Sequence, residues 1–333
     1  MRYQFIEEQQ SQFRLNVLLR VLGVCASAFY GWKKRPVSQR EQQKETLVAH
    51  ICALFEASGG RYGSPRIHRD LEAMGIKCSP KRVAQLMKEQ HLLARKPRKF
   101  VVTTDSNHAF PLAQNLLNRE YQVENVAGLD RAWAGDITYV PTSQGWLYLA
   151  VVLDLKSRKV IGWSMRDSLE QTLVHEALEM ALGQRLCTEV EGELVEGQLL
   201  FHSDRGSQYA AHDYQEKLME SRIVCSMSRR GNCWDNAVVE SFFATLKKEE
   251  VHRQDYLTRE QAKASLFFYI EIFYNRKRRH SALGYQSPHD YEQSLLNSVS
   301  TLAGEVHFLQ NSKRRGRDKH WLSRPLLALQ FKN

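Results

Sequence analysis

The sequence lacks the features expected of a membrane-spanning, secreted or disulfide-stapled protein. It contains no run of eighteen apolar residues, the minimum expected of a transmembrane helix. Its first eight residues, MRYQFIEE, have no apolar stretch of the kind that forms the core of a secretory signal. Its 6 cysteines are scattered without a CxxC pair, which favours reduced thiols over a disulfide framework. These absences favour a cytoplasmic protein with no membrane partner.

What the sequence does have is an uneven distribution of positive charge. The chain has 333 residues, enough for two or three domains, and it carries a net charge of +10. Residues 1–120 hold 20 Lys and Arg against 10 Asp and Glu, residues 121–300 hold 20 against 25, and the last 33 hold 7 against 2. A basic front and tail around an acidic middle suggest DNA-binding parts that flank a catalytic part. Basic faces that are merely solvated would give the same balance.

The first 96 residues read as two short helical regions. In residues 1–40, leucines recur at helical spacing on either side of Gly23, and Ser27 is a candidate cap for a second helix. This segment resembles the outline of a helix-turn-helix, and a plain helical hairpin remains the alternative. In residues 41–96, Ser64-Pro65 and Ser79-Pro80 each predict a helix start, with Gly75 between them where a helix would end.

The helix expected over residues 80–90 has the pattern of a DNA-recognition helix. Lys81, Arg82 and Lys88 fall on its polar face, and a recognition helix needs such a face near its N-terminal end. Residues 41–96 are therefore predicted to be a helix-turn-helix-like DNA-binding domain, with an ordinary three-helix bundle as the alternative. Residues 97–122 are predicted to be a basic and polar linker.

From residue 123 to 292 the pattern becomes that of a mixed α/β domain. Apolar and β-branched runs predict strands, and helical patterns separate the later strands. The strands are expected at 130–140, 145–154, 158–165, 198–201 and 223–227. The helices are expected at 168–186, at 210–221 and from Asp235 onward. Three strands followed by alternating helices and strands is the order of a ribonuclease H-like fold. It is also compatible with other mixed α/β folds.

Three carboxylates in this domain have the positions that a two-metal phosphoryl-transfer site needs. Asp136 lies within the first predicted strand, Asp204 follows the fourth, and Glu240 lies on the last helix, with 35 residues between Asp204 and Glu240. Hard divalent cations prefer oxygen ligands, and a pair of them can clamp the attacking and leaving oxygens of a phosphodiester. Lys247 lies seven residues after Glu240, two helical turns on and nearly on the same face, where it could meet DNA. Further DNA contacts are predicted at five arginines: Arg229, Arg230, Arg276, Arg278 and Arg279.

These motifs resemble those of the IS-three family of insertion-sequence transposases, specifically its second-reading-frame protein with a retroviral-integrase-like core. The resemblance rests on WAGDITY around Asp136, HSDRGSQY around Asp204, NCWDN before Glu240, the YNRKRRH run that ends at His280, and YGSPRIH at 62–68. It implies an integrase-type catalytic core of five mixed strands with helices. It also implies that Asp136, Asp204 and Glu240 are the catalytic metal ligands for two Mg²⁺ or Mn²⁺ ions.

The same resemblance implies partners and a place of action. The partners would be the terminal inverted repeats of the element, its target DNA and a first-frame protein that carries a helix-turn-helix and a coiled coil. The chain would act as a homo-oligomer on DNA, in the bacterial cytoplasm at the nucleoid. Residues 293–333 match no feature of the family and are expected to form a basic tail of unknown role.

Two other functions remain open at the level of the sequence. One is a nuclease on the same fold that cuts DNA without joining it. The other is a non-catalytic DNA-binding remnant or regulator of an element. The Lys247 helix and the upstream DNA-binding helices argue against the nuclease. Because all three carboxylates are present, the regulator would have to rest on the unusual C-terminus or on a missing partner.

Overall fold

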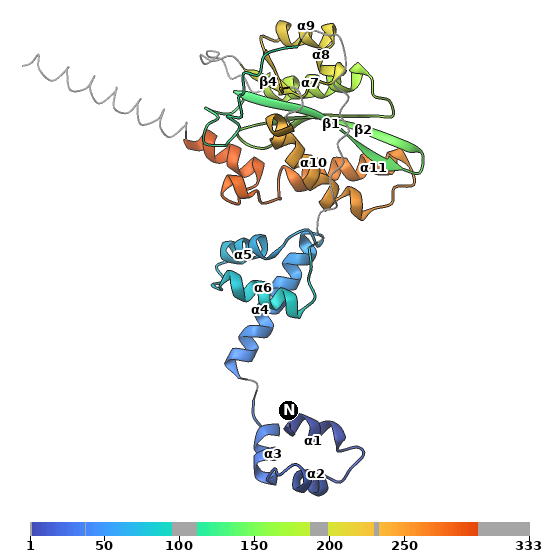
Figure 1. Cartoon of the computed structure of the whole chain (residues 1–333). Helices are drawn as coiled ribbons and strands as arrows, with labels where there is room; N and C mark the ends of the chain where they lie inside the picture. The colour runs from blue at the N-terminus through green and yellow to red at the C-terminus, as the bar shows by residue number, and fades with distance from the viewer. Residues whose placement is uncertain (1, 37, 95–111, 187–198, 230–232, 299–333) are drawn as a thin grey trace, which may run out of the picture. The chain divides into compact units, whose positions relative to one another are not determined.

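The structure, a computed structural model, describes residues 2–36, 38–94, 112–186, 199–229 and 233–298 (Figure 1). The chain divides into two compact units, Met1–Ala94 and Arg95–Asn333. Within the described ranges no single helix is long and apolar enough to cross a bilayer, although the pair Leu15–Val21 and Ala26–Lys33, bent by 110°, meets that length and composition test together. The predicted basic run at 95–99 and most of the predicted tail at 293–333 lie outside the described residues.

The first unit begins with three short helices, α1 (Arg2–Gln9), α2 (Leu15–Val21) and α3 (Ala26–Lys33). Their core is formed by Ile6, Leu18, Leu19 and Phe29. Gly23, with φ +62°, turns the chain between α2 and α3, as the sequence predicts. Two details differ from the prediction: α1 was not expected, and Cys25 rather than Ser27 occupies the N-cap of α3.

The rest of the first unit is a second group of three helices, α4 (Gln39–Ala57), α5 (Ser64–Ala73) and α6 (Pro80–Glu89). The Ser79 hydroxyl accepts a hydrogen bond from the Arg82 backbone N–H at 3.2 Å, so the predicted cap of α6 is confirmed. Gly75, at φ +76°, lies just past α5 as expected. The buried face of α6 carries Val83, Leu86 and Met87, which leaves its basic residues on the other side.

The second unit is built on one five-stranded sheet in the order β3-β2-β1-β4-β5. The strands are β1 (Ala132–Thr142), β2 (Gly145–Asp154), β3 (Val160–Arg166), β4 (Leu200–Ser203) and β5 (Val224–Met227). The first three pair antiparallel, while β4 and β5 add in parallel on the other side of β1. This mixed sheet, with β1 at its centre, confirms the predicted ribonuclease H-like architecture.

Helices cover both faces of the sheet (Figure 1). On one side lie α7 (Gln171–Leu186), α8 (Ser207–Ala210) and α9 (His212–Glu220). On the other lie α10 (Ala237–Glu249) and α11 (Arg259–Phe267), and α11 continues into a π-helical stretch, η3 (Phe268–Tyr274). Short 3₁₀ turns, η1 (Cys233–Asn236), η2 (Val251–Arg253) and η4 (Ser281–Leu283), join these elements, and residues 288–298 are helical.

The core between the sheet and α7 depends on a close backbone approach at Gly162 of β3. A Cβ atom there would lie 2.1 Å from the Ala177 carbonyl oxygen and 2.9 Å from the Ala181 Cβ. Only glycine lets α7 sit this near the strand, where Trp133, Leu173 and Phe201 fill the interior.

The predicted linker at 97–122 does not run free along its whole length. Its described part, from residue 112, packs on the second unit: Leu117 is buried, and the backbone N–H groups of Leu116 and Leu117 donate to the Ser226 hydroxyl at 2.9 and 3.3 Å. Buried Leu117 and these two hydrogen bonds hold the segment against β5, at the edge of the sheet.

Candidate active site

Asp136 lies near the middle of β1, the central strand, opposite Val151 of β2. The Ile137 backbone N–H donates to Asp136 Oδ1 at 2.8 Å, which fixes one oxygen of the carboxylate. Burial, the charge of Asp204 and, more weakly, the charge of Glu240 raise the pKa of Asp136 well above its usual range. A bound cation would stabilise the ionised form of this carboxylate, because it would offset the repulsion from the other two.

Asp204 follows directly on β4, whose last residue, Ser203, pairs with Gly135 of β1. The parallel register therefore brings Asp204 beside Asp136, although the two lie far apart in the sequence. Its Oδ1 accepts a hydrogen bond from the Gly206 N–H at 2.9 Å, and a Cβ at Gly206 would lie only 3.0 Å from that oxygen. The small residue two positions after Asp204 keeps the turn tight around the carboxylate.

Gly135 is a part of the site that the sequence motif contained but whose role it did not reveal. A Cβ at this position would lie 2.6 Å from the Phe201 ring and 3.4 Å from that of Tyr209. A side chain here would therefore push β1 away from β4 and separate Asp136 from Asp204. Tyr209 is fully buried, and burial is the main cause of its strongly raised pKa. It is therefore an uncharged residue next to the two carboxylates.

Glu240 and Lys247 come from α10, which contacts β1 and buries Val239, Phe242 and Leu246. Burial and the charge of Asp204 raise the pKa of Glu240. Lys247 Nζ lies 5.2 Å from the centre of the Tyr139 ring, and burial lowers the pKa of Lys247 while Asp136 opposes that shift. The charges of Asp204, Glu240 and Lys247 all act on Asp136, so the three predicted carboxylates and the predicted lysine lie in one neighbourhood.

The start of α10 differs from the prediction. The helix was expected to begin at Asp235 as its N-cap, but η1 occupies 233–236 and α10 begins at Ala237 with no side-chain cap. Asp235 is buried and binds other groups instead: it accepts from Arg229 Nε and Nη2 at 2.9 and 2.8 Å and from Arg119 Nε at 3.0 Å. These hydrogen bonds hold the pKa of Asp235 well below its usual range.

Asn236, the next residue, ties the start of α10 to the central strand. It is buried, and its Nδ2 donates to the Gly135 carbonyl oxygen at 3.4 Å. This bond reaches the residue immediately before Asp136, so Asn236 helps to fix the helix that carries Glu240 relative to the strand that carries Asp136. The sequence offered only the NCWDN motif as a signal, with no indication of this contact.

His202 lies two residues before Asp204, fully buried within β4. Its ring nitrogens are hydrogen-bonded to the hydroxyls of Ser226 at 2.9 Å and Ser228 at 3.2 Å. Burial lowers the pKa of His202 from its ordinary 6.5 to about 4. His202 is therefore a neutral packing and hydrogen-bonding residue that joins β4 to β5.

This burial predicts a specific loss of stability in mild acid. Because the folded pKa is the lower one, the unfolded chain binds more protons between about pH 6.5 and 4, so stability falls as the pH falls through that range. Between pH 7 and 5 we expect His202 to cost about 2 kcal/mol of unfolding free energy, measured by urea unfolding. His202→Asn should remove this part of the pH dependence, and an equal slope in both proteins would contradict the assignment.

The other predicted DNA contacts differ in how available their side chains are. Lys81, Lys88 and Arg276 are exposed, Arg82 is half-buried, and Arg230 lies outside the described residues. Arg229 and Arg279 are occupied by structural bonds, Arg229 to Asp235 and Arg279 Nη1 to the Tyr285 carbonyl oxygen at 3.0 Å.

Arg278 requires a correction. It is only 5 % exposed, and its Nε and Nη2 both donate to Glu249 at 2.8 Å. A guanidinium buried and paired in this way cannot also reach a phosphate. The charge run that suggested a DNA contact here therefore includes a residue of the core, and Arg278 leaves the predicted set.

The donor set at Asp136, Asp204 and Glu240 fits a divalent cation in its chemistry. All three ligands are carboxylates, the groups that hard cations prefer. Burial and the charge of neighbouring carboxylates raise the pKa values of Asp136 and Glu240, and a cation would offset that repulsion. Across the described part of the chain no three His, Cys, Asp or Glu side chains stand close enough together to form a ready-made metal cluster. The three carboxylates are close enough to repel one another. One oxygen of Asp136 and one of Asp204 each accept a hydrogen bond from a backbone N–H group.

A ribonuclease H-like sheet with carboxylates on its central strand, at the end of the adjacent strand and on the covering helix defines the integrase-core class of proteins. The comparisons agree with this class. The integrase core domain family matches residues 129–233 and a second integrase core domain family matches 221–288, while an HTH-like domain family matches 42–100.

The curated relatives identify the particular family. The chain is 41% identical over 298 residues to the transposase InsF for insertion sequence IS3A of Escherichia coli K12, covering 89% of this chain and 100% of the relative. It is 39% identical over 271 residues to the insertion element IS600 31 kDa protein of Shigella sonnei, covering 81% and 96%. The chain belongs to the IS3 family of insertion-sequence transposases, and it is a DNA-binding polynucleotidyl transferase of the integrase type.

Solved structures that match the chain include two catalytic cores. That of BIV integrase has 18% identity and a TM-score of 0.37, covering 51% of this chain and 99% of the other. That of the Mos1 mariner transposase has 13% identity and a TM-score of 0.39, covering 55% and 89%. The family assignment rests on the sequence relatives and not on these likenesses.

Proposed function

We propose that the chain cleaves and joins the ends of an insertion sequence at a site formed by Asp136, Asp204 and Glu240. The observation that supports this most directly is the convergence of the three carboxylates. They come from β1, from the end of β4 and from α10, and the pKa values of Asp136 and Glu240 are raised by burial and by the charge of Asp204. Such a site positions a phosphodiester and neutralises charge, and it needs no covalent intermediate with the enzyme.

The cofactor of this proposal is a pair of Mg²⁺ or Mn²⁺ ions held by the same three residues. When bound, the ions supply activation of the attacking oxygen and neutralisation of the leaving one. The protein's own part is to hold the carboxylates on rigid elements. The register of β1 with β4 places Asp136 beside Asp204, and the packing of α10 on β1 places Glu240 next to them.

DNA contacts are proposed in both units. In the first unit, Lys81, Arg82 and Lys88 lie on α6 outside its buried face, the arrangement expected of a recognition helix. In the second unit, Lys247 lies beside the carboxylates and Arg276 lies exposed at the end of the π-helical stretch. The DNA is proposed to be the terminal inverted repeats of an element together with target DNA.

The partners proposed beyond DNA are a second copy of the chain and the first-frame product of the same element. Joining two element ends to one target requires two active sites, which supports a homo-oligomer on DNA. A first-frame protein with its own helix-turn-helix and coiled coil would add recognition of the ends. The domain limits proposed from the sequence are 1–40, 41–96, 97–122, 123–292 and 293–333.

A strand-transfer assay with labelled element ends, target DNA and Mg²⁺ or Mn²⁺ tests the proposed function. We expect end cleavage followed by joining to target. Cleavage without joining would instead support a nuclease, and binding without cleavage, unchanged by Asp204→Ala, would support a regulator. The first-frame protein is added in a parallel reaction, so that a missing partner is not mistaken for a missing activity.

We expect Lys247→Met to weaken binding to element-end DNA by about 10-fold and to reduce the salt slope of binding by about one ion. The reason is that its ammonium group lies next to Asp136, where the scissile phosphate would sit. The measurement is an anisotropy titration at several salt concentrations. Lys248→Met is the matched control, since the adjacent lysine is on a different face of α10, and an unchanged salt slope for Lys247→Met would contradict the contact.

A further inference from the structure

A cavity of about 320 Å³ lies beside α10, on a face of that helix other than the catalytic one. Ala237, Ser241 and Thr245 line it, at the four-residue spacing that marks one side of a helix. Successive helical residues turn by about 100°, so this side is rotated away from Glu240 and Lys247. The cavity is therefore a separate site on an element shared with the active site.

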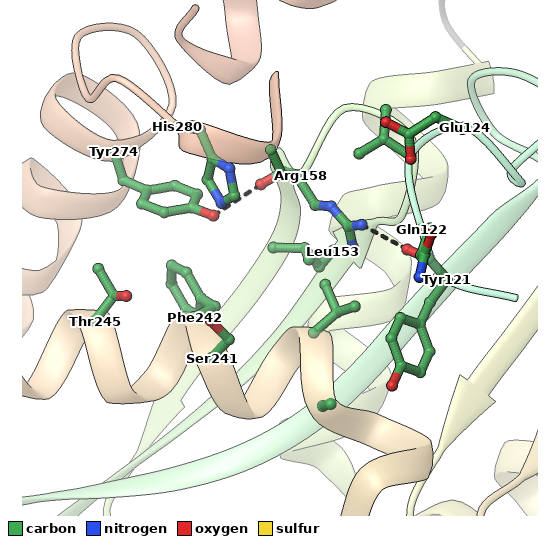
Figure 2. Close-up of a pocket in the computed structure, with 14 residues that line it drawn as sticks. Tyr121, Gln122, Glu124, Leu153, Arg158, Ser241, Phe242, Thr245, Tyr274 and His280 are labelled. Atoms are coloured by element: carbon green, nitrogen blue, oxygen red, sulfur yellow. Dashed lines mark hydrogen bonds between the residues drawn. The ribbon is translucent and has the colours of Figure 1, made fainter. Parts of the chain in front are cut away.

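The cavity contains a buried cation with an unsatisfied donor. Arg158, in the turn between β2 and β3, is 6 % exposed and lines the cavity (Figure 2). Its Nη2 donates to the Tyr121 carbonyl oxygen at 2.5 Å, but its Nη1 has no hydrogen-bond partner among the described residues. Leaving a guanidinium N–H buried and unpaired is costly, which makes this atom a candidate for an acceptor that a ligand would bring.

The backbone around Arg158 holds the side chain in place. The Tyr274 hydroxyl donates to the Arg158 carbonyl oxygen at 3.0 Å, and the guanidinium extends from there toward Tyr121 and Gln122 (Figure 2). A site preorganised in this way loses little side-chain entropy when it binds.

The other residues that line the cavity determine what the rest of an anionic ligand would be. Apolar side chains, including Val123, Leu153 and Phe242, face the same space as the hydroxyls of Ser241 and Thr245. The carboxylate of Glu124 also lines the cavity, so its total charge does not suit a polyanion such as a nucleic-acid backbone. The lining suits a single negative charge on an apolar body.

We propose that this cavity binds a small monoanion, a carboxylate carried on an aromatic or apolar body, with the carboxylate bound by Arg158. The proposal is independent of the catalytic chemistry, because it rests on the walls of this cavity alone. A ligand here would pack against the helix that carries Glu240.

The test is a ligand-observed NMR titration of the full chain, without DNA or metal, using 2-naphthoate and its neutral analogue 2-naphthamide. We expect saturable binding of 2-naphthoate at least about 10-fold tighter than that of the amide, because only the carboxylate pairs with the guanidinium. Acetate should compete only weakly, since it lacks the apolar body. Equal affinity for the acid and the amide, or no saturable binding of either, would overturn the proposal.

Variants then locate the site. Ser241→Leu, at an exposed position, should fill the cavity and weaken naphthoate binding by about 10-fold, whereas Ala244→Leu, exposed on the same helix but outside the cavity, should leave it unchanged. Arg158→Gln should abolish the preference for the acid over the amide. If Arg158→Gln does not fold, the comparison of Ser241→Leu with Ala244→Leu still decides the matter, and equal binding by those two variants would place the ligand elsewhere.

Discussion

We expect Asp204→Asn to lower the rate of strand transfer by roughly 10³-fold or more while leaving affinity for element-end DNA nearly unchanged. The substitution keeps the shape of the side chain and its bond from the Gly206 N–H, but it removes the charge that a cation needs. Asp136→Asn and Glu240→Gln should behave in the same way. The measurement is single-turnover strand transfer with Mg²⁺, together with a DNA-binding titration of each variant.

The control for this prediction is Asp213→Asn, which removes an exposed carboxylate from the start of α9 in the same unit. It should retain full activity. If Asp136→Asn, Asp204→Asn or Glu240→Gln kept wild-type strand transfer, that residue would not belong to the site. If DNA binding fell in step with activity, the loss would reflect DNA positioning instead of chemistry.

We also expect a large loss of stability when the buried ion pair between Glu249, at the end of α10, and Arg278 is broken. Glu249 accepts two hydrogen bonds from Arg278 and one from the Tyr269 hydroxyl at 2.9 Å. Glu249→Ala would leave the Arg278 charge buried without its partner, so we expect a loss of about 3–5 kcal/mol in unfolding free energy. Urea unfolding of the full chain, followed by circular dichroism, measures it.

The double variant Glu249→Met with Arg278→Met supplies the comparison. Because it removes both charges and keeps side-chain volume, it should be much less destabilised than Glu249→Ala. Arg276→Gln, two residues away but exposed, should cost almost nothing. A loss below about 1 kcal/mol for Glu249→Ala would show that the pair does not anchor the helix that carries Glu240 and Lys247.

The sheet was predictable because its strands carry their own signals. Alternating and apolar runs, bounded by turn residues, located all five strands to within about two residues, and β2 has the predicted limits. Asp136 and Asp204 could be placed on or beside strands for the same reason. The cap at Ser79 and the turn at Gly75 were equally local, since each depends on residues only a few positions apart.

What could not be predicted depends on partners far away in the sequence. Arg278 sits in a run of charges that looks solvated, and only its pairing with Glu249, 29 residues earlier, makes it a core residue. Asp235 is a residue type common at N-caps, but its carboxylate accepts hydrogen bonds from two arginines instead. One is Arg229, and the other is Arg119, 116 residues away. Gly135 resembles any strand glycine until Phe201 is seen against it.

Local patterns also miss weak or irregular helices. The helix α1 buries only Ile6, so it has no apolar stripe to reveal it. The aromatic stretch from Ser265 to Tyr274 is not one regular α-helix, because α11 ends at Phe267 and a π-helical stretch follows. Both outcomes depend on packing that the sequence does not encode within a single window.

The most direct test of the central claim is a count of Mn²⁺ ions bound to the chain in complex with element-end DNA, by electron paramagnetic resonance. If Asp136, Asp204 and Glu240 form the catalytic site, the wild-type complex will bind two Mn²⁺ ions per active site, close enough (about 3.5–4 Å) for their spins to couple. Asp136→Asn, Asp204→Asn and Glu240→Gln should each lose the coupled signal, while Asp213→Asn retains it. A coupled pair that persists in all three carboxylate variants would place the metal ions, and the chemistry, somewhere else in the molecule.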